Sequence, residues 1–143
     1  MIQRVQTIWL LIAAACAFLS LKLSVYSGNI FKDATGTTPV KTYQELNGMY
    51  HLGLNISTIA IGVIVLICIF LYKNRKLQTR LCIAAIAIEL LIIFQYYSAI
   101  KIFSEGSLTI TSILQPAIIF LLMMAMRGIR KDERIISESD RLR

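Results

Sequence analysis

Charged residues are scarce in this chain, and their scarcity decides its class. Asp, Glu, Lys and Arg make up 16% of the 143 residues, and apolar residues make up 57%. Soluble domains average about 25% charged and about 45–50% apolar residues. This composition excludes an ordinary soluble domain and is typical of a membrane protein. A chain of this length is expected to form one domain.

Cysteine and histidine are too few for several kinds of chemistry. The three cysteines, Cys16, Cys68 and Cys82, lie within apolar runs and form no CxxC pair, which disfavours a thiol–disulfide oxidoreductase with loop cysteines. His51 is the sole histidine, so a histidine-bridged metal or haem site is not expected. The sequence also lacks a glycine-rich phosphate loop and a nucleophile elbow. We therefore predict no catalytic residue, no metal, no cofactor and no enzymatic activity.

Long apolar runs are what the sequence does have. Each is close to the ~20 residues that a helix needs to cross about 30 Å of hydrocarbon. Only helices satisfy every backbone polar group within segments of this kind. We therefore predict four transmembrane helices, at about residues 7–26, 54–72, 81–100 and 108–126.

The links between the runs predict the topology. Residues 73–80 and 101–107 are short links, which make the helices that they join antiparallel neighbours, and residues 27–53 form a long outer loop. The expected fold is an all-α membrane protein, an up-down-up-down four-helix bundle within residues 1–126. A charged tail, residues 127–143, follows it.

The basic residues predict the orientation. With the N-terminus inside, the cytoplasmic side holds eleven of the 15 Lys and Arg residues: Arg4, Lys73, Arg75, Lys76, Arg80, Arg127, Arg130, Lys131, Arg134, Arg141 and Arg143. The other side holds Lys22, Lys32, Lys41 and Lys101. This asymmetry places both termini in the cytoplasm. Because the basic residues adjoin apolar runs, the net charge of +7 does not indicate nucleic-acid binding.

One carboxylate, Glu89, interrupts the third run in the stretch AAIAIELLIIF. An ionisable side chain near the bilayer midplane costs about 2.5–3.5 kcal/mol on insertion scales. The apolar residues around it offset that cost, at about 0.3–0.6 kcal/mol each. The helix therefore inserts, but Glu89 is expected to face the bundle interior and not lipid.

The polar residues on the neighbouring helix offer Glu89 a partner. Tyr96 shares its helix face, and the fourth helix carries Ser112 and Gln115. We predict a Glu89–Gln115 hydrogen bond, with a further polar contact near Ser112, whose carbonyl Pro116 frees. No cation lies within reach, so we expect Glu89 to be protonated. Three roles stay open: an interhelical hydrogen bond, contact with a partner subunit, and proton or ion handling.

The tail alternates positive and negative charges more densely than topology requires. Two interpretations stay open, a helix lying against lipid phosphates and a docking peptide for a partner protein. The candidate contact residues are Arg130, Lys131, Asp132, Glu133, Arg134, Asp140, Arg141 and Arg143.

Two stretches carry a family resemblance: the opening MIQRVQTIWLL, residues 1–11, and the ending, with GIRKDE at 128–133 and SDRLR at 139–143. With these ends the chain resembles a domain-of-unknown-function family of small four-helix membrane proteins from bacteria of the Bacteroidetes type. The resemblance implies a bacterial inner-membrane protein and supports the bundle. It implies no activity and no catalytic residues.

These features together predict a non-enzymatic inner-membrane protein, an accessory subunit that docks onto a larger membrane complex. Its expected partners are other integral membrane proteins and membrane lipids, with no nucleic acid and no identified small-molecule substrate. The alternative is a small oligomeric proton-coupled transporter that uses Glu89.

Overall fold

The computed structural model describes residues 3–32, 40–72 and 74–141, with side chains for residues 6–30, 41–72 and 74–135. The chain is mostly helical and carries a small sheet. Its elements are α1 (Gln3–Leu19), β1 (Tyr26–Lys32), β2 (Val40–Leu46), α2 (Leu52–Phe70), α3 (Arg75–Ile100), β3 (Glu105–Leu108), the 3-10 helix η1 (Ile110–Ile113) and α4 (Leu114–Arg141).

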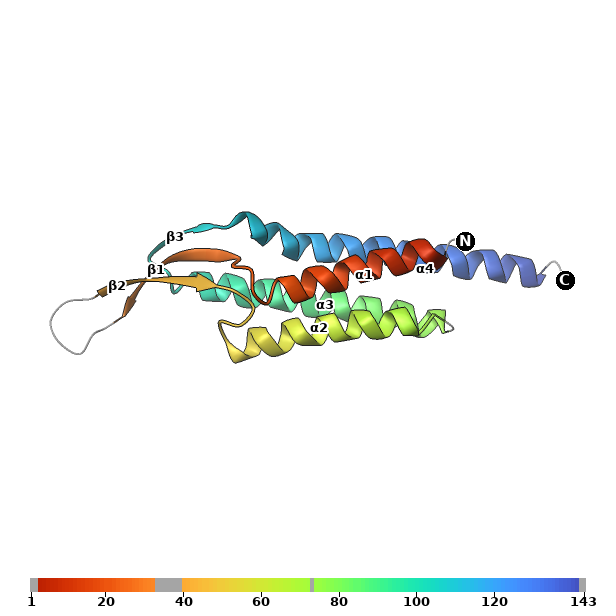
Figure 1. Ribbon diagram of the computed structural model, residues 1–143. Helices are drawn as coiled ribbons and strands as arrows, with labels where there is room; N and C mark the ends of the chain where they lie inside the picture. Colours follow the sequence, from red (N-terminus) through yellow and green to blue (C-terminus); the bar gives the residue numbers. More distant parts are fainter. Residues whose placement is uncertain (1–2, 33–39, 73, 142–143) are drawn as a thin grey trace.

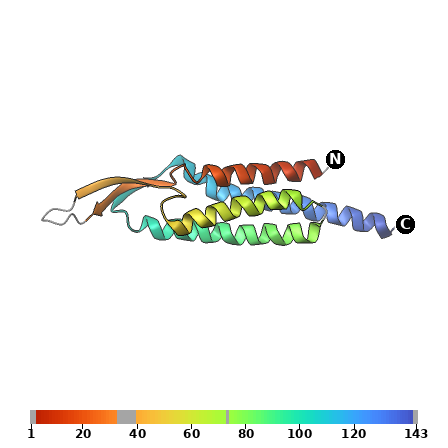
Figure 2. The ribbon, with the colours of Figure 1, turned by 60° about the horizontal axis from the view of Figure 1, so that its bottom comes forward.

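The four α-helices form an elongated antiparallel bundle (Figures 1 and 2). Each helix packs against the next in sequence, and α4 packs against α1, so the ring of helices is closed. The sheet lies at one end of the bundle, and both ends of the described chain lie at the other (Figure 1). The helix arrangement therefore has the up-down-up-down order predicted from the short links.

Apolar side chains cover the outside of the bundle as well as its core. Leu52, Phe70, Phe94 and Ile113 are among the large hydrophobic residues that are exposed. Three helical segments, α2, α3 and Ile110–Ile135, are long and apolar enough to cross a membrane, and Gln6–Leu19 is a shorter apolar helix. An apolar surface on apolar helices of this length indicates association with a membrane.

Two strands of the sheet lie largely in the predicted outer loop and the third largely in the predicted link at residues 101–107, and no sheet was expected in an all-α protein. Its strand order is β2-β1-β3, with both neighbours antiparallel to β1. The first helix, predicted to reach residue 26, ends at Leu19, and the Val25 N–H bonds to the Leu46 carbonyl at 2.7 Å. Residues 20–25 form turns and Tyr26 begins β1. Their apolar composition does not mark where the helix ends, so the sequence pattern placed residues 20–26 in the wrong element.

A pair of glycines lets β3 approach β1 closely. Gly28 and Gly106 face each other in the register, and a Cβ at Gly106 would lie 2.6 Å from the Tyr26 ring. A Cβ at Gly28 would overlap the Glu105 carbonyl oxygen. Glycine in a strand is expected where another backbone approaches closely. Gly28, which the prediction placed in the outer loop, therefore belongs to a strand.

The limits of the third and fourth helices also differ from the prediction. Helix α3 begins before residue 81, and the fourth helix begins after residue 108, because β3 ends there and η1 precedes α4. Asn74 caps α3 by accepting a hydrogen bond from the Leu77 N–H at 3.4 Å. The helix therefore begins at Arg75 and includes most of the link predicted at residues 73–80. Helix α4 continues through the predicted limit at residue 126 to Arg141. Pro116 lies in its first turn, where a proline removes no intrahelical hydrogen bond, so no carbonyl is freed at Ser112 by a kink.

Candidate functional site

The predicted charged tail divides at the end of the bundle into an inner and an outer face. Asp132 is buried, together with Ile129 one turn earlier. Three of the basic candidates, Arg130, Lys131 and Arg134, are exposed, and Glu133 is partly exposed. Asp140, Arg141 and Arg143 lie outside the residues with described side chains. The inward position of Asp132 makes it a candidate for a site inside the bundle.

Asp132 meets the first helix there. The Gln6 side-chain amide donates a hydrogen bond to Oδ2 of Asp132, and both residues are buried. Gly128, one turn before Asp132, makes room for Gln6, because a Cβ at this position would lie 2.8 Å from Gln6 Cγ. The two helices are therefore in close contact at this end.

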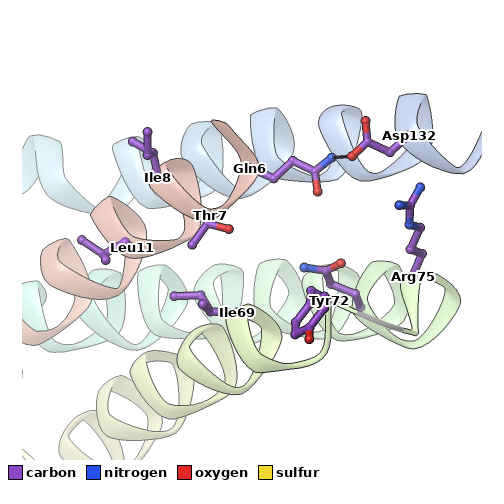
Figure 3. Close-up of a pocket in the computed structure, with 9 residues that line it drawn as sticks. Gln6, Thr7, Ile8, Leu11, Ile69, Tyr72, Arg75 and Asp132 are labelled. Atoms are coloured by element: carbon purple, nitrogen blue, oxygen red, sulfur yellow. Dashed lines mark hydrogen bonds between the residues drawn. The ribbon is translucent and has the colours of Figure 1, made fainter. Parts of the chain in front are cut away.

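A cavity of about 480 Å³ opens beside this hydrogen bond, and its volume is within the range of small-molecule sites. Figure 3 shows the side chains around it, which come from all four helices. Its mouth is formed by exposed lining residues of α1 and by Tyr72, just after α2, and is mostly apolar: Ile8, Leu11 and Tyr72 are 55%, 57% and 57% exposed. Its lining residues are Gln6, Thr7, Ile8, Leu11, Ile69, Tyr72, Arg75, Gln78 and Asp132.

The floor of the cavity is polar. Buried Gln78 donates a hydrogen bond to the Cys68 carbonyl at 3.0 Å and so satisfies one of the last carbonyls of α2, which have no partner within the helix. Arg75 extends from the start of α3 toward Asp132 (Figure 3). Its Nη1 is buried and has no hydrogen-bond partner. The ion pair found within 4.0 Å among the described side chains is Lys41–Glu105, so Arg75 and Asp132 are not directly paired.

A second polar group lies deeper in the bundle. Glu89 is 0% exposed, and Gln115 and Tyr96 are also buried. Neither carboxyl oxygen of Glu89 has a hydrogen-bond partner, and the same holds for Gln115 Nε2 and the Tyr96 hydroxyl. The predicted Glu89–Gln115 hydrogen bond is therefore wrong.

The register of α3 against α4 explains the missing bond. Gln78 and Asp132 line one cavity, and Gln115 lies 17 residues before Asp132, or about 25 Å along the helix. Because Arg75 also lines this cavity, this corresponds to residues 92–95 on the antiparallel α3, about 4.5–9 Å beyond Glu89. Ser112 belongs to η1 and is partly exposed, so it is not part of this group.

Asp132 alone of the nine lining residues was a predicted site residue. The polar residues Gln6, Arg75 and Gln78 were missed. Gln78 had a signal, since it extends the buried face of Cys82, Ala85 and Glu89 by one turn. No sequence signal distinguishes Gln6 and Arg75, because polar residues are usual at the ends of apolar runs. In the described part of the chain, no group of three His, Cys, Asp or Glu residues is placed to hold a metal ion.

Comparison with known families adds one match. A model of the family described as a domain of unknown function, DUF4293, matches residues 2–142. This confirms the expected membership of a domain-of-unknown-function family. No curated protein and no solved structure matches the chain.

Proposed function

The chain belongs to the DUF4293 family, and we propose that it is a four-pass protein of the bacterial cytoplasmic membrane that serves as a non-enzymatic accessory subunit of a larger membrane complex. The first helix is the shortest, with 17 residues from Gln3 to Leu19. It lies beside α2 and α4, which are long enough to cross, so it shares their depth in the membrane.

The proposed orientation puts the cavity end in the cytoplasm and the sheet outside. The basic residues support it, because eleven of the 15 belong to the cavity end under the positive-inside rule. Exposed lysines lie at both ends of the molecule, and they provide a test without any substitution. A membrane-impermeant amine reagent on intact cells should label Lys41 and Lys101, and should reach Lys76 and Lys131 only after permeabilisation. Labelling in the reverse order would overturn the orientation.

The observation that carries the subunit proposal is the length of α4. The helix projects beyond the other three at the cavity end (Figures 1 and 2), and Asp132 is the last buried residue among those whose side chains are described. Ile135, about one turn beyond Asp132 where the projection begins, is 46% exposed. Because helices in proteins owe most of their stability to packing of an amphipathic face, a projecting helix with an exposed isoleucine and charges of both signs supports docking to a partner.

Two matched variants test this docking. Ile135→Ser removes the apolar group from the projecting helix, and Ile113→Ser makes the same change at an exposed position at the sheet end. After mild detergent extraction, the native protein should migrate on a native gel as an assembly larger than the lone chain. Ile135→Ser, or removal of residues 136–143, should release the lone chain, and Ile113→Ser should not. A native protein that already migrates alone would refute the proposal.

A second candidate function is a small oligomeric proton-coupled transporter. It draws on Glu89, because an intramembrane carboxyl without a hydrogen-bond partner is a functional candidate. In proteoliposomes, Glu89→Gln should then abolish proton flux and leave the oligomer intact. The absence of proton flux with the native protein would remove this candidate.

A further inference from the structure

The cavity at the end of the bundle has two chemically different parts. Its mouth is lined by exposed Ile8 and Leu11, and its floor holds Asp132, Gln6 and Gln78, which are buried. It opens at one end of the apolar helices, where the hydrocarbon core of a bilayer gives way to headgroups. A ligand that suits this arrangement has a polar head for the floor and an apolar chain for the mouth.

The floor carries one charge of each sign. The buried Nη1 of Arg75 has no hydrogen-bond partner, which is costly for a charged donor away from water. Among the described side chains, Gln6 is the donor to Asp132, through Oδ2, so Oδ1 remains able to accept. Arg75 and Asp132 lie on α3 and α4, and the Arg75 side chain extends toward Asp132 without reaching it (Figure 3).

We propose that this cavity binds one zwitterionic phospholipid, phosphatidylethanolamine, with its phosphate at Arg75 and its ammonium at Asp132. A phosphate oxygen accepts from the unpartnered Arg75 N–H in a charge-assisted hydrogen bond. The ammonium donates to Asp132, and an acyl chain leaves over Ile8 and Leu11. The site requires only that the bundle lies in a membrane. The assignment to the inner leaflet rests on the proposed orientation.

Headgroup chemistry makes this assignment selective. Phosphatidylglycerol has the phosphate but no cation, so it would bring a negative headgroup against Asp132 with no compensating charge. Phosphatidylcholine has a cation without an N–H donor and cannot hydrogen-bond to the carboxylate. Inorganic phosphate lacks the apolar chain for the mouth. Phosphatidylethanolamine alone among these supplies the anion, the N–H donors and the chain.

Lipid retention measured by native mass spectrometry tests the site. The full-length protein is stripped of lipid, reconstituted into vesicles of equal parts phosphatidylethanolamine, phosphatidylglycerol and phosphatidylcholine, and extracted in mild detergent. The native protein should retain one phosphatidylethanolamine. Arg75→Gln should lower its occupancy about tenfold, the effect expected for one charge-assisted hydrogen bond. Asp132→Asn should abolish the preference over phosphatidylglycerol.

Matched controls separate the site from general electrostatics. Arg80→Gln makes the same change as Arg75→Gln on the same helix, at an exposed position outside the cavity lining. Glu133→Gln is the counterpart of Asp132→Asn and neutralises the next carboxylate, which is partly exposed and outside the lining. Both should retain the lipid as the native protein does. Arg75→Lys keeps the positive charge and should therefore retain more lipid than Arg75→Gln.

Three results would overturn the proposal: equal retention of the lipids by the native protein, unchanged retention in Arg75→Gln, or displacement of the lipid by soluble phosphoethanolamine or inorganic phosphate. The last result would indicate a soluble ligand in place of a lipid. The readout is the mass of the bound lipid and not the size of an assembly. A failure here therefore leaves the subunit proposal untouched, and a failure of that proposal leaves this site in place.

Discussion

Gln6 in α1 donates a buried hydrogen bond to Asp132 in α4, 126 positions later in the chain. This bond closes the ring of helices at the end where no strand connects them. Because both residues are buried, loss of one leaves the other without its partner away from water, which is costlier than loss of an exposed hydrogen bond.

Asp132→Ala should therefore destabilise the bundle. The stranded Gln6 amide should lower the free energy of unfolding by about 1–3 kcal/mol. Buried Cys68 and Cys82 are free thiols, so a thiol-reactive dye reports unfolding during heating or denaturant titration. Glu133→Ala, at the next and more exposed position, should change stability by less than about 0.5 kcal/mol. Equal changes in the free energy of unfolding for the two variants would show that the buried Gln6–Asp132 hydrogen bond does not stabilise the bundle.

Replacing Glu89 with an apolar residue of similar length should stabilise the bundle, in contrast to Asp132→Ala. Because its two carboxyl oxygens have no hydrogen-bond partner, Glu89→Met replaces a costly buried polar group with an apolar one of similar length. It should raise the free energy of unfolding by about 1–3 kcal/mol. Glu89→Ala should lower it, because the substitution leaves a cavity. The same thiol assay measures both, and a less stable Glu89→Met would show that the carboxyl makes a favourable interaction.

Gly62 sets the distance between α1 and α2. A Cβ at this position would lie 2.8 Å from the Phe18 ring, whereas a Cβ at Gly53, in the same helix, would lie 3.6 Å from Gln95. Gly53→Ala should gain helix propensity, about 1 kcal/mol. Gly62→Ala should lose about 1–3 kcal/mol through overpacking. If thermal unfolding ranks the two variants equally, the Phe18 ring moves aside without cost.

Gly28→Ala should separate β3 from β1. The new methyl group would overlap the Glu105 carbonyl oxygen, which belongs to the backbone and has little freedom to move. Amide hydrogen exchange should accelerate at residues 26–29 and 105–108 and remain slow in the helices. Ser27→Ala, one position earlier, serves as the control, and its exchange should match that of the native protein.

Helix number and order could be predicted from the sequence, because apolar runs of spanning length have few alternatives. The limits could not, and each error has a local cause. Val25 and Tyr26 are apolar and continue the first run, yet they pair with strands that lie far along the chain. Asn74 starts a helix within a stretch that charge alone marked as a link.

Glu89 and the cavity residues also differ in how far the sequence could predict them. Glu89 is visible in the sequence, because a lone carboxylate in an apolar run is conspicuous, but its expected partner failed on the register of α3 and α4. The cavity residues Gln6 and Asp132 are ordinary polar residues near the ends of helices. Their partnership depends on the closure of the ring, which no local pattern contains.

The three-stranded sheet limits how the helices can move. Strand β1 and its partner β2 belong to the link between α1 and α2, and β3 belongs to the link between α3 and α4. The sheet thus joins the two helical hairpins at one end, and the short link from Phe70 to Arg75 joins them at the other end, where the cavity lies. The hairpins are therefore tied together at both ends. A molecule held by Arg75 and Asp132 on the second hairpin, and in contact with Ile8 and Leu11 on the first, would add a third connection between them.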